Sequence, residues 1–248
     1  MKKAVLISGA SSGIGAATAK LFSDKGYFVF VLGRNEDRLQ EVALQCRNGA
    51  SILKCDLNNE VQVNKYTQHL FERPDVSLEI LINNAGIFQT HDFLHDGLDI
   101  WRKQFETNLF GSIQLTQKIL PLFFVQGHGS IVNISSTLGL KPVAHTSAYS
   151  ASKAAMINWT QSLAIELGPK KIRVNCVCPG IVDTPLHSFH KADSKEKTET
   201  LEKMKPLQPL QRIGSSEEIA EAIYFLGSAQ SSWTTGAVLS VDGGINLV

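Results

Sequence analysis

Tyr149 and Lys153 are four residues apart, a spacing that places two side chains on the same face of a helix, one turn apart. An isolated phenol has a pKa of about 10 and is protonated at neutral pH. An ammonium group within about 4–6 Å favours the phenolate and lowers that pKa. The pair is therefore a candidate proton donor and acceptor. The same spacing also occurs in ordinary surface Tyr–Lys pairs, so other parts of the chain must distinguish the two interpretations.

The residues around this pair predict a helix over Ala148–Leu167, because apolar residues recur there with helical spacing. Pro169 follows just past the end of the pattern, where helices commonly stop. A strand is predicted before it at Ser130–Ile134, and two hydroxyls, Ser135 and Ser136, come at its carboxyl end. The candidate acid–base pair is thus expected at the start of a long helix that follows a buried strand.

Three glycines follow an apolar run at Ala4–Ile7 that is typical of a central parallel strand. Gly9, Gly13 and Gly15 lie between this strand and a predicted helix that closes at Gly26. At such a junction the backbone can approach a pyrophosphate, and the positive end of the helix faces its charge. A small-residue connection without a ligand is the alternative, but the complete strand–turn–helix context favours a nucleotide.

The second predicted strand, Tyr27–Leu32, ends at Gly33 and Arg34, where the adenosine ribose of a dinucleotide would lie. NAD sites usually place a carboxylate here to accept hydrogen bonds from the 2′-hydroxyl. A guanidinium suits a 2′-phosphate instead. Glu36 and Asp37 follow closely and are interpreted as first-turn acids of the next helix. The sequence therefore favours NADP(H), with NAD(H) as the alternative.

Strands and helices alternate along the whole chain. Further strands are predicted at Ser51–Cys55, Glu79–Ile82, Ile172–Val177 and Ala237–Val241, and further helices at Glu60–Phe71, about Leu98–Leu120 and Ser216–Leu226. This alternation predicts an α/β fold: a single Rossmann-type domain over residues 1–248, whose doubly wound parallel sheet has about seven strands and helices on both faces. A polar segment at about 185–206 is predicted to form a helical flap over the substrate, although a solvated surface helix explains its composition nearly as well.

Composition narrows the classes of partner. The formal net charge of +1 gives no electrostatic reason to expect nucleic acid or an anionic membrane. No apolar run approaches the roughly 18 residues that a membrane span needs. Cys46, Cys55, Cys176 and Cys178 lack the spacing of a disulfide framework, so they are interpreted as reduced thiols of a cytoplasmic protein. No metal is expected, because neither the cysteines nor the histidines form a complete metal-binding motif.

Over essentially its full length the chain resembles the short-chain dehydrogenase/reductase family, in particular its 3-oxoacyl-[acyl-carrier-protein] reductase-like members. The resemblance depends on motifs that occur in one order: Gly9-x-x-x-Gly13-x-Gly15, Asn83-Asn84-Ala85-Gly86, Asn108, Ser136, Tyr149-x-x-x-Lys153 and Pro179-Gly180. Ser8 stands where the family usually has threonine and keeps its hydroxyl. Ser12 stands where many NADP-preferring members have a second basic residue, which leaves Arg34 as the main ligand of a 2′-phosphate.

The resemblance implies an enzyme that interconverts a carbonyl and a secondary alcohol by hydride transfer. Tyr149 would be the general acid and base, and Ser136 would hydrogen-bond the carbonyl oxygen. Lys153 would lower the pKa of the tyrosine and hold the nicotinamide ribose, and Asn108 would anchor a water that leads to solvent. The residues implied to bind the cofactor are Gly9, Ser11, Ser12, Gly13, Ile14, Gly15, Arg34, Asp56, Leu57, Asn83, Ala85, Gly86, Tyr149, Lys153, Pro179, Gly180, Ile181 and Thr184.

The sequence does not identify the substrate. By resemblance its pocket would be lined by Phe88, Leu138, His145 and Leu186, a mixed lining that suits many small ketones and alcohols. A homotetramer, or a dimer, is implied by the family alone. Two other functions also remain: a nucleotide-binding regulator without catalysis, and an epimerase or dehydratase that uses the same Tyr–Lys pair. A regulator would not need the full catalytic set, and the compact length argues against the epimerase.

Overall fold

The computed structural model describes residues 1–186 and 194–248, and a seven-stranded sheet forms its centre. The strands are β1 (Lys2–Ser8), β2 (Phe28–Gly33), β3 (Ala50–Lys54), β4 (Val76–Asn83), β5 (Gly129–Ile134), β6 (Ile172–Pro179) and β7 (Val238–Val241). Their order across the sheet is β3-β2-β1-β4-β5-β6-β7, and every neighbouring pair is parallel. The predicted doubly wound parallel sheet is confirmed.

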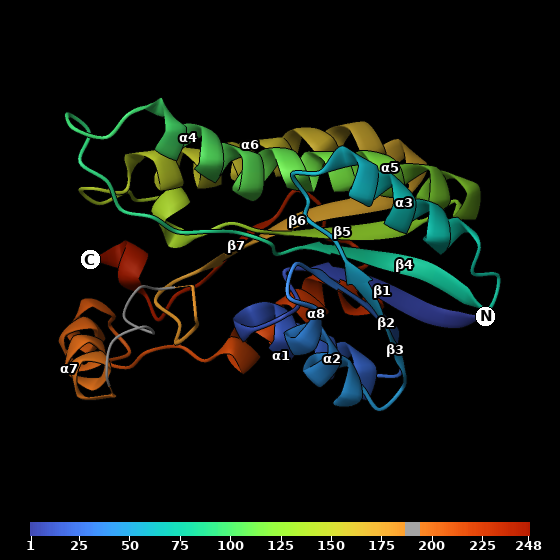
Figure 1. Ribbon diagram of the computed structural model, residues 1–248, viewed down its shortest axis with the longest axis horizontal. Coiled ribbons are helices and arrows are strands. Elements are labelled where there is room, and N and C mark those ends of the chain that lie inside the picture. The colour runs from blue at the N-terminus through green and yellow to red at the C-terminus, as the bar shows by residue number, and fades with distance from the viewer. Residues whose placement is uncertain (187–193) are drawn as a thin grey trace.

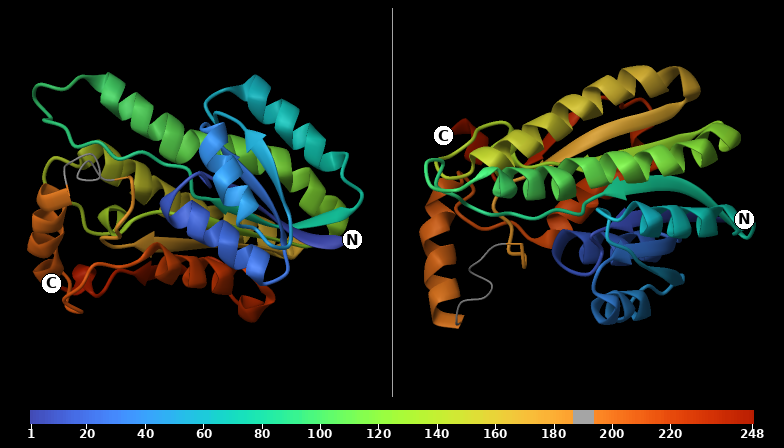
Figure 2. Two further views of the ribbon diagram at one scale, coloured as in Figure 1. Left: turned by 60° about the horizontal axis from the view of Figure 1, so that its bottom comes forward. Right: turned by 45° about the horizontal axis from the view of Figure 1, so that its top comes forward.

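Helices cover both faces of this sheet (Figure 1). One face carries α1 (Gly13–Asp24), α2 (Glu36–Leu44) and α8 (Ser216–Gly227), and the left view of Figure 2 shows α1 and α8 side by side across it. The other face carries α3 (Glu60–Phe71), α4 (Leu98–Phe105), α5 (Gly111–Gln126) and α6 (Ser147–Leu167). A further helix, α7 (Ser194–Met204), lies apart from both layers, at the end of the molecule towards which the strands run (Figure 1).

The alternation of side chains along β1 explains why both faces are covered. Ala4 and Leu6 point to one side of the sheet and belong to a core shared with α3, α5 and α6. Val5 and Ile7 point to the other side and belong to a core shared with α1, α2 and α8. All four side chains are fully buried. Since burying a Val, Leu or Ile side chain contributes roughly 1.5–3 kcal/mol, a strand that is apolar on both faces needs a helical layer on each.

The single helix predicted at about Leu98–Leu120 is wrong in two respects. It is divided into α4 and α5 by a π-helical turn at Glu106–Phe110, and it continues to Gln126, beyond Pro121. The wider turn lets the Asn108 side chain reach the backbone after β4, a contact that local helical periodicity does not reveal. Pro121 is tolerated because the helix beyond it packs into the core, where Phe123 is fully buried.

The predicted flap is described only in part. Residues 187–193 lie outside the described residues, and α7 forms much of the remainder. The Lys197 ammonium pairs with the Asp183 carboxylate at 3.0 Å, which joins α7 to the segment after β6. A single domain with a substrate flap stays a prediction. Among the described helices, none combines the length and the apolar character needed to cross a membrane.

Candidate active site

The carboxyl ends of β1 and β4 are tied together by side chains. The Ser8 hydroxyl accepts from the N–H groups of Asn84 and Ala85, at 3.0 and 3.1 Å. The Asn84 amide donates to the main-chain oxygens of Ser8 and Gly9, at 3.1 and 3.2 Å. From β1 the chain runs outward to β2 and β3, and it then returns to continue with β4 on the other side. These bonds therefore shape the point where the strand order reverses, which is where doubly wound proteins bind their ligands.

The glycine turn after β1 is a close approach between backbones. Gly9 has a φ of +65°, and a Cβ added to it would lie 2.8 Å from the Cα of Ala85. A Cβ on Gly15 would lie 2.3 Å from the Gly9 oxygen. Gly13 has a φ of +53°, and its Cβ would lie 3.2 Å from the Cβ of Thr184. A side chain at Gly9 or Gly15 would collide with backbone atoms, and one at Gly13 would press on Thr184, which the turn brings to the start of α1.

The start of α1 suits a phosphate group. Ser12, the residue that precedes the helix, has an extended backbone, and its side chain makes no capping hydrogen bond. The first N–H groups of a helix have no partner within the helix, and they carry the positive end of its dipole. Ser11 lies towards Gly33 at the end of β2, so the turn and the tip of β2 adjoin. A pyrophosphate on these amides with a ribose towards β2 fits the residues present.

Arg34 follows Gly33 directly at the tip of β2. Its side chain is exposed, and no hydrogen bond or ion pair joins its guanidinium to another described residue. The neighbouring carboxylates are committed to α2, as predicted: Glu36 and Asp37 lie in its first turn, and Glu36 pairs with Lys54 at 2.9 Å. A cation is therefore presented at this position.

Three of the residues predicted to bind the cofactor have side chains that are buried or that bond to other parts of the protein. The Asn83 side chain is fully buried, and its amide donates to Thr116 at 3.0 Å and to Asn133 at 2.8 Å. A contact of Asn83 with an adenosine ribose would thus have to come from its backbone. Asp56 accepts a hydrogen bond from the N–H of Asn58, and its neighbour Leu57 is buried. Sequence reasoning could not divide the roles of two adjacent asparagines; Asn84, not Asn83, meets the glycine turn.

Tyr149 is buried in the first turn of α6, with only 5% of its surface exposed. Burial raises the pKa of Tyr149 to about 12, and a hydrogen bond with the Ser136 side chain opposes this rise. Ser136 follows β5, and its oxygen accepts from the N–H of Leu138 at 3.1 Å. The edge of the Phe88 ring meets the Tyr149 ring at a centroid distance of 4.8 Å. The structure thus joins Ser136, Tyr149 and one predicted pocket residue.

Lys153 lies one turn along α6, and its Nζ is 5.8 Å from the centroid of the Tyr149 ring. Nζ donates to the main-chain oxygen of Ile134 at 2.8 Å, and burial lowers the pKa of Lys153 to about 8. Burial of the phenol is the largest influence on its pKa and raises it, so a lowering of that pKa by the Lys153 ammonium stays a prediction. Ser135 was not among the residues predicted from the sequence. Its hydroxyl donates a hydrogen bond to the Lys153 main-chain oxygen at 2.7 Å.

Asn108 is fully buried in the π-helical turn and pairs with the backbone of Ile87 in both directions. Its Oδ1 accepts from the Ile87 N–H at 2.7 Å, and its Nδ2 donates to the Ile87 oxygen at 3.0 Å. Nδ2 also donates to Ser152 at 3.1 Å, and Ser152 donates to the Tyr149 main-chain oxygen at 2.7 Å. A Cβ added to Gly86 would lie 3.3 Å from Oδ1 of Asn108 and 3.5 Å from Nζ of Lys153. All four candidate catalytic residues therefore converge beside the end of β4.

The remaining predicted residues lie in the loop before α6 and in the segment that begins at the end of β6. His145 lies in the loop before α6 with a φ of +64°, and Leu186, 39% exposed, is the last described residue before α7. A Cβ on Gly180 would lie 2.7 Å from the Cα of Asp242, so the Pro179-Gly180 pair marks a close approach after β6. Ile181 follows it and lies near Gly214, whose N–H donates to the Ile181 oxygen at 3.0 Å.

The cysteines are free thiols, and all four are buried. Cys176 and Cys178 point to the same side of β6 with their sulfurs 4.0 Å apart, as alternation along a strand predicts. Within the described ranges, no group of three or more His, Cys, Asp or Glu side chains could hold a metal ion.

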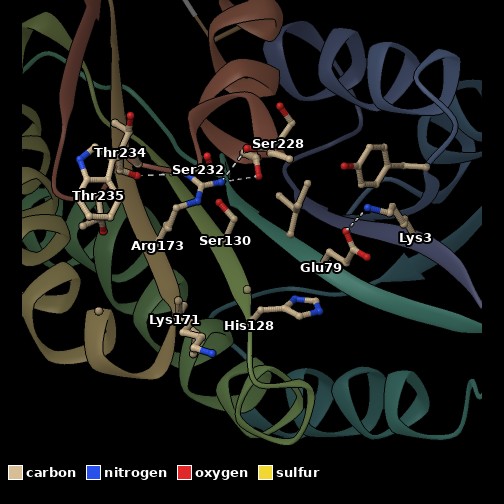
Figure 3. A pocket seen from close by; sticks show the side chains of 18 residues that line it. Lys3, Glu79, His128, Ser130, Lys171, Arg173, Ser228, Ser232, Thr234 and Thr235 are labelled. Atoms are coloured by element: carbon tan, nitrogen blue, oxygen red, sulfur yellow. Dashed lines mark hydrogen bonds and ion pairs between the residues drawn. The ribbon is translucent and has the colours of Figure 1, made fainter.

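A cavity of about 540 Å³ opens at the opposite, amino end of the strands (Figure 3). Arg173 lies in its wall and donates to the main-chain oxygens of Leu226, Gly227 and Ser228, at 2.8, 3.1 and 2.9 Å. Its guanidinium thus stabilises the end of α8. None of the candidate site residues lines this cavity, so it is separate from the centre around Tyr149.

The parallel sheet and its glycine turn define a Rossmann-type fold of the nucleotide-binding class. Residues 9–246 match a family model described as enoyl-(acyl carrier protein) reductase. The chain is 38% identical to cis-4-hydroxycyclohexanecarboxylate dehydrogenase of Sinomonas cyclohexanicum, over 100% of this chain and 98% of the relative. It is 34% identical to 3-oxoacyl-[acyl-carrier-protein] reductase of Aquifex aeolicus, over 98% and 97% of the two chains.

Solved structures agree with these relatives. The ligand-free aldohexose dehydrogenase of Thermoplasma acidophilum superposes with a TM-score of 0.90 at 33% identity, over 100% of this chain and 95% of that one. ElxO with NADP bound superposes with a TM-score of 0.91 at 30% identity, over 100% of both chains. The chain belongs to the short-chain dehydrogenase/reductase family, and it is an oxidoreductase of that family.

Proposed function

We propose that this enzyme interconverts a ketone and a secondary alcohol with NADP(H), and that Tyr149 is its general acid and base. The observation that carries the proposal is the hydrogen-bonded pair of Ser136 and Tyr149, with the Lys153 ammonium on the same face of α6. A bound NADPH supplies the hydride; the chain supplies the proton and the electrostatic environment.

The Ser136 and Tyr149 hydroxyls act on the same atom, the carbonyl oxygen of the substrate. Ser136 donates a hydrogen bond to the carbonyl oxygen and stabilises the negative charge that develops there. Tyr149 donates its proton to the same oxygen as the charge appears. Since the pKa of Tyr149 is raised to about 12, the phenol is fully protonated at neutral pH, which suits it to the reductive direction. In the oxidative direction Tyr149 would need to lose that proton first.

Lys153 stabilises the phenolate that remains after proton transfer. Its ammonium lies in the same buried region and has a pKa lowered to about 8, so it is largely charged at neutral pH. The charge attracts the developing phenolate more strongly in this low-dielectric surrounding than it would in water. Hydrogen bonds through Asn108 and Ser152 connect the Ile87 backbone to the start of α6, which keeps the phenol aligned.

Preference for NADP(H) is proposed from the tip of β2. Arg34 presents a guanidinium there, and Glu36, which would repel a 2′-phosphate, is paired with Lys54. The NADP-bound structure of ElxO supports the same cofactor. By the same resemblance we propose that Gly9, Ser11, Ser12, Gly13, Ile14 and Gly15 hold the pyrophosphate, and that Ile181 and Thr184 adjoin the nicotinamide side.

The assembly is proposed to be a homotetramer, or a dimer, in the cytoplasm. Large apolar side chains on the outer faces of α5, α6 and the loop before β7 support association: Val125 is 88%, Ile165 79% and Trp233 100% exposed. Light scattering measures this directly, and a mass near that of the 27.1 kDa chain would contradict it.

The test of the proposed chemistry compares the wild-type enzyme with Tyr149→Phe. Three probes cover the substrates named for the relatives: cis-4-hydroxycyclohexanecarboxylate with NADP⁺, a 3-oxoacyl thioester with NADPH, and an aldohexose with NADP⁺. We expect turnover of at least one probe, a loss of about 10³-fold or more in Tyr149→Phe, and NADPH binding that stays within about twofold. Wild-type activity in Tyr149→Phe would refute the acid–base role, and NADPH binding without turnover of any ketone or alcohol would favour a regulator.

A further inference from the structure

The helix that carries Tyr149 and Lys153 does not cap itself. Thr146, which precedes α6, makes no side-chain capping bond to the helix. Its hydroxyl donates instead to the Val143 oxygen at 2.7 Å and lies 2.8 Å from the Ser150 hydroxyl. The first N–H groups of a helix have no partner within the helix, so they need partners from other parts of the chain.

His91 supplies that partner from a distant part of the chain. The Ala148 N–H, directly before Tyr149, donates to Nε2 of His91 at 3.3 Å. The Ser147 hydroxyl lies 2.8 Å from the same nitrogen. The bond from the Ala148 N–H requires a lone pair on Nε2, and the ring proton is then on Nδ1, which is buried and has no hydrogen-bond partner among the described residues. His91 is 5% exposed, so this neutral ring is a buried acceptor at the start of α6.

The backbone of His91 holds the other side of the same junction. Its N–H donates to the His145 oxygen at 3.0 Å. His145 has a φ of +64°, a conformation that non-glycine residues rarely adopt and that needs support from its surroundings. One residue therefore fixes both the loop before α6 and the first turn of α6.

The segment that leads to His91 connects it to the candidate active site. Ile87 pairs with Asn108, Phe88 packs edge-on against Tyr149, and the Gln89 oxygen accepts from Gln104 of α4 at 3.1 Å. The edge of the Trp101 ring meets the His91 ring at 5.9 Å. Segment 87–91 is thus bonded to α4, to the π-helical turn and to α6 at successive residues.

We infer that His91 is a positioning residue, which holds the start of α6 so that the Tyr149 hydroxyl points at the substrate oxygen. The inference rests on the proposed function for its effect on catalysis, but the contact itself does not. Without the Nε2 acceptor the Ala148 N–H and the Ser147 hydroxyl lose their buried partner, and the first turn of α6 loosens where the acid–base residue is attached. Transition-state alignment is affected more than cofactor binding, since only Tyr149 and Lys153 of the proposed cofactor contacts lie on α6, while the glycine turn lies on other elements.

The experiment compares His91→Phe, which keeps a ring beside Trp101 but removes the acceptor, with His91→Gln, whose side-chain oxygen can reach the position of Nε2. His128→Phe, an exposed histidine at the other end of the sheet, is the matched control. Hydrogen–deuterium exchange of the free protein over residues 146–152 is measured together with kcat, KM and the NADPH dissociation constant.

We expect His91→Phe to exchange at least tenfold faster over residues 146–152 and to lose at least tenfold in kcat, with the NADPH dissociation constant within about twofold. His91→Gln should recover most of both losses, and His128→Phe should match the wild type. Unchanged exchange in His91→Phe, or equal losses in the Phe and Gln variants, would overturn the inference. Failure of the proposed function appears separately, as activity retained by Tyr149→Phe, and the exchange result stands in either case.

Discussion

Nζ of Lys153 lies 2.8 Å from the main-chain oxygen of Ile134 and donates a hydrogen bond to it. This contact links the first turns of α6 to the last residue of β5, directly before Ser135 and Ser136. The ammonium is thereby held beside the candidate acid–base residue, in a place where its charge is costly. Burial lowers the pKa of Lys153 from its usual value of 10.5 to about 8.

This lowered pKa predicts how stability changes with pH. Between about pH 8 and 10.5 the unfolded chain holds the Lys153 proton and the folded chain has lost it, so the free energy of unfolding rises with pH across this window. In Lys153→Met this contribution disappears. The difference between the two proteins should therefore change by on the order of 2–3 kcal/mol from pH 7 to pH 10.5.

Urea unfolding of the wild type and Lys153→Met at several pH values measures that difference. The buried Cys46 and Cys55 thiols have pKa values raised to about 11, so they make the free energy of unfolding fall with pH in both proteins. Their contribution cancels when the two proteins are compared. A difference independent of pH between 7 and 10.5 would show that Lys153 titrates normally.

In the reductive direction we also expect kcat to fall as pH rises through about 8, because neutral Lys153 no longer stabilises the phenolate.

Arg34→Ala should change the cofactor preference. Loss of a charge-assisted contact to the 2′-phosphate costs about 1.5–3 kcal/mol, so NADPH binding should weaken by about 10–100-fold while NADH binding changes little. Fluorescence titration with both cofactors measures the two dissociation constants. Arg38→Ala, an exposed arginine in α2, is the control and should leave both unchanged. Equal weakening of NADPH and NADH in Arg34→Ala would contradict a 2′-phosphate site.

Asn108→Ala should lower both the stability of the protein and its rate of turnover. It leaves the N–H and oxygen of Ile87 without their partners, each at a cost of about 1–3 kcal/mol. Since 1 kcal/mol shifts Tm by about 2–4 °C for a chain of this size, a drop of about 4–24 °C is expected in a thermal scan. Asn64→Ala, an exposed site in α3, is the control. A Tm within 1 °C of wild type would mean that water replaces the side chain at no cost.

Gly9→Ala tests the close approach of β1 and β4. The added Cβ would lie 2.8 Å from the Ala85 Cα, and the φ of +65° is itself unfavourable for alanine. Gly26→Ala is the matched control, because Gly26 also has a positive φ, of +90°, but its Cβ would meet no atom within 4 Å. We expect both variants to lose about 1 kcal/mol from backbone strain and only Gly9→Ala to lose NADPH binding as well. Tight NADPH binding by Gly9→Ala would place the cofactor elsewhere.

The sequence by itself determined the features that depend on local periodicity. An apolar strand, a glycine turn and an amphipathic helix each follow from spacing that is visible within one segment, so the parallel sheet, the glycine positions and the shared face of Tyr149 and Lys153 could all be predicted. The first-turn acids Glu36 and Asp37 were predictable for the same reason, because their role is decided within α2.

Only the tertiary structure decided which groups meet across the fold. Asn83 and Asn84 are adjacent in sequence, yet one amide is buried beneath α5 and the other meets the glycine turn. The Asn108 side chain in the π-helical turn meets the Ile87 backbone, and the acceptor at the start of α6 comes from His91, 57 residues before Ala148. The raised pKa of Tyr149 has the same origin: desolvation depends on everything packed around a side chain, and spacing along one helix reports only its neighbours on that helix.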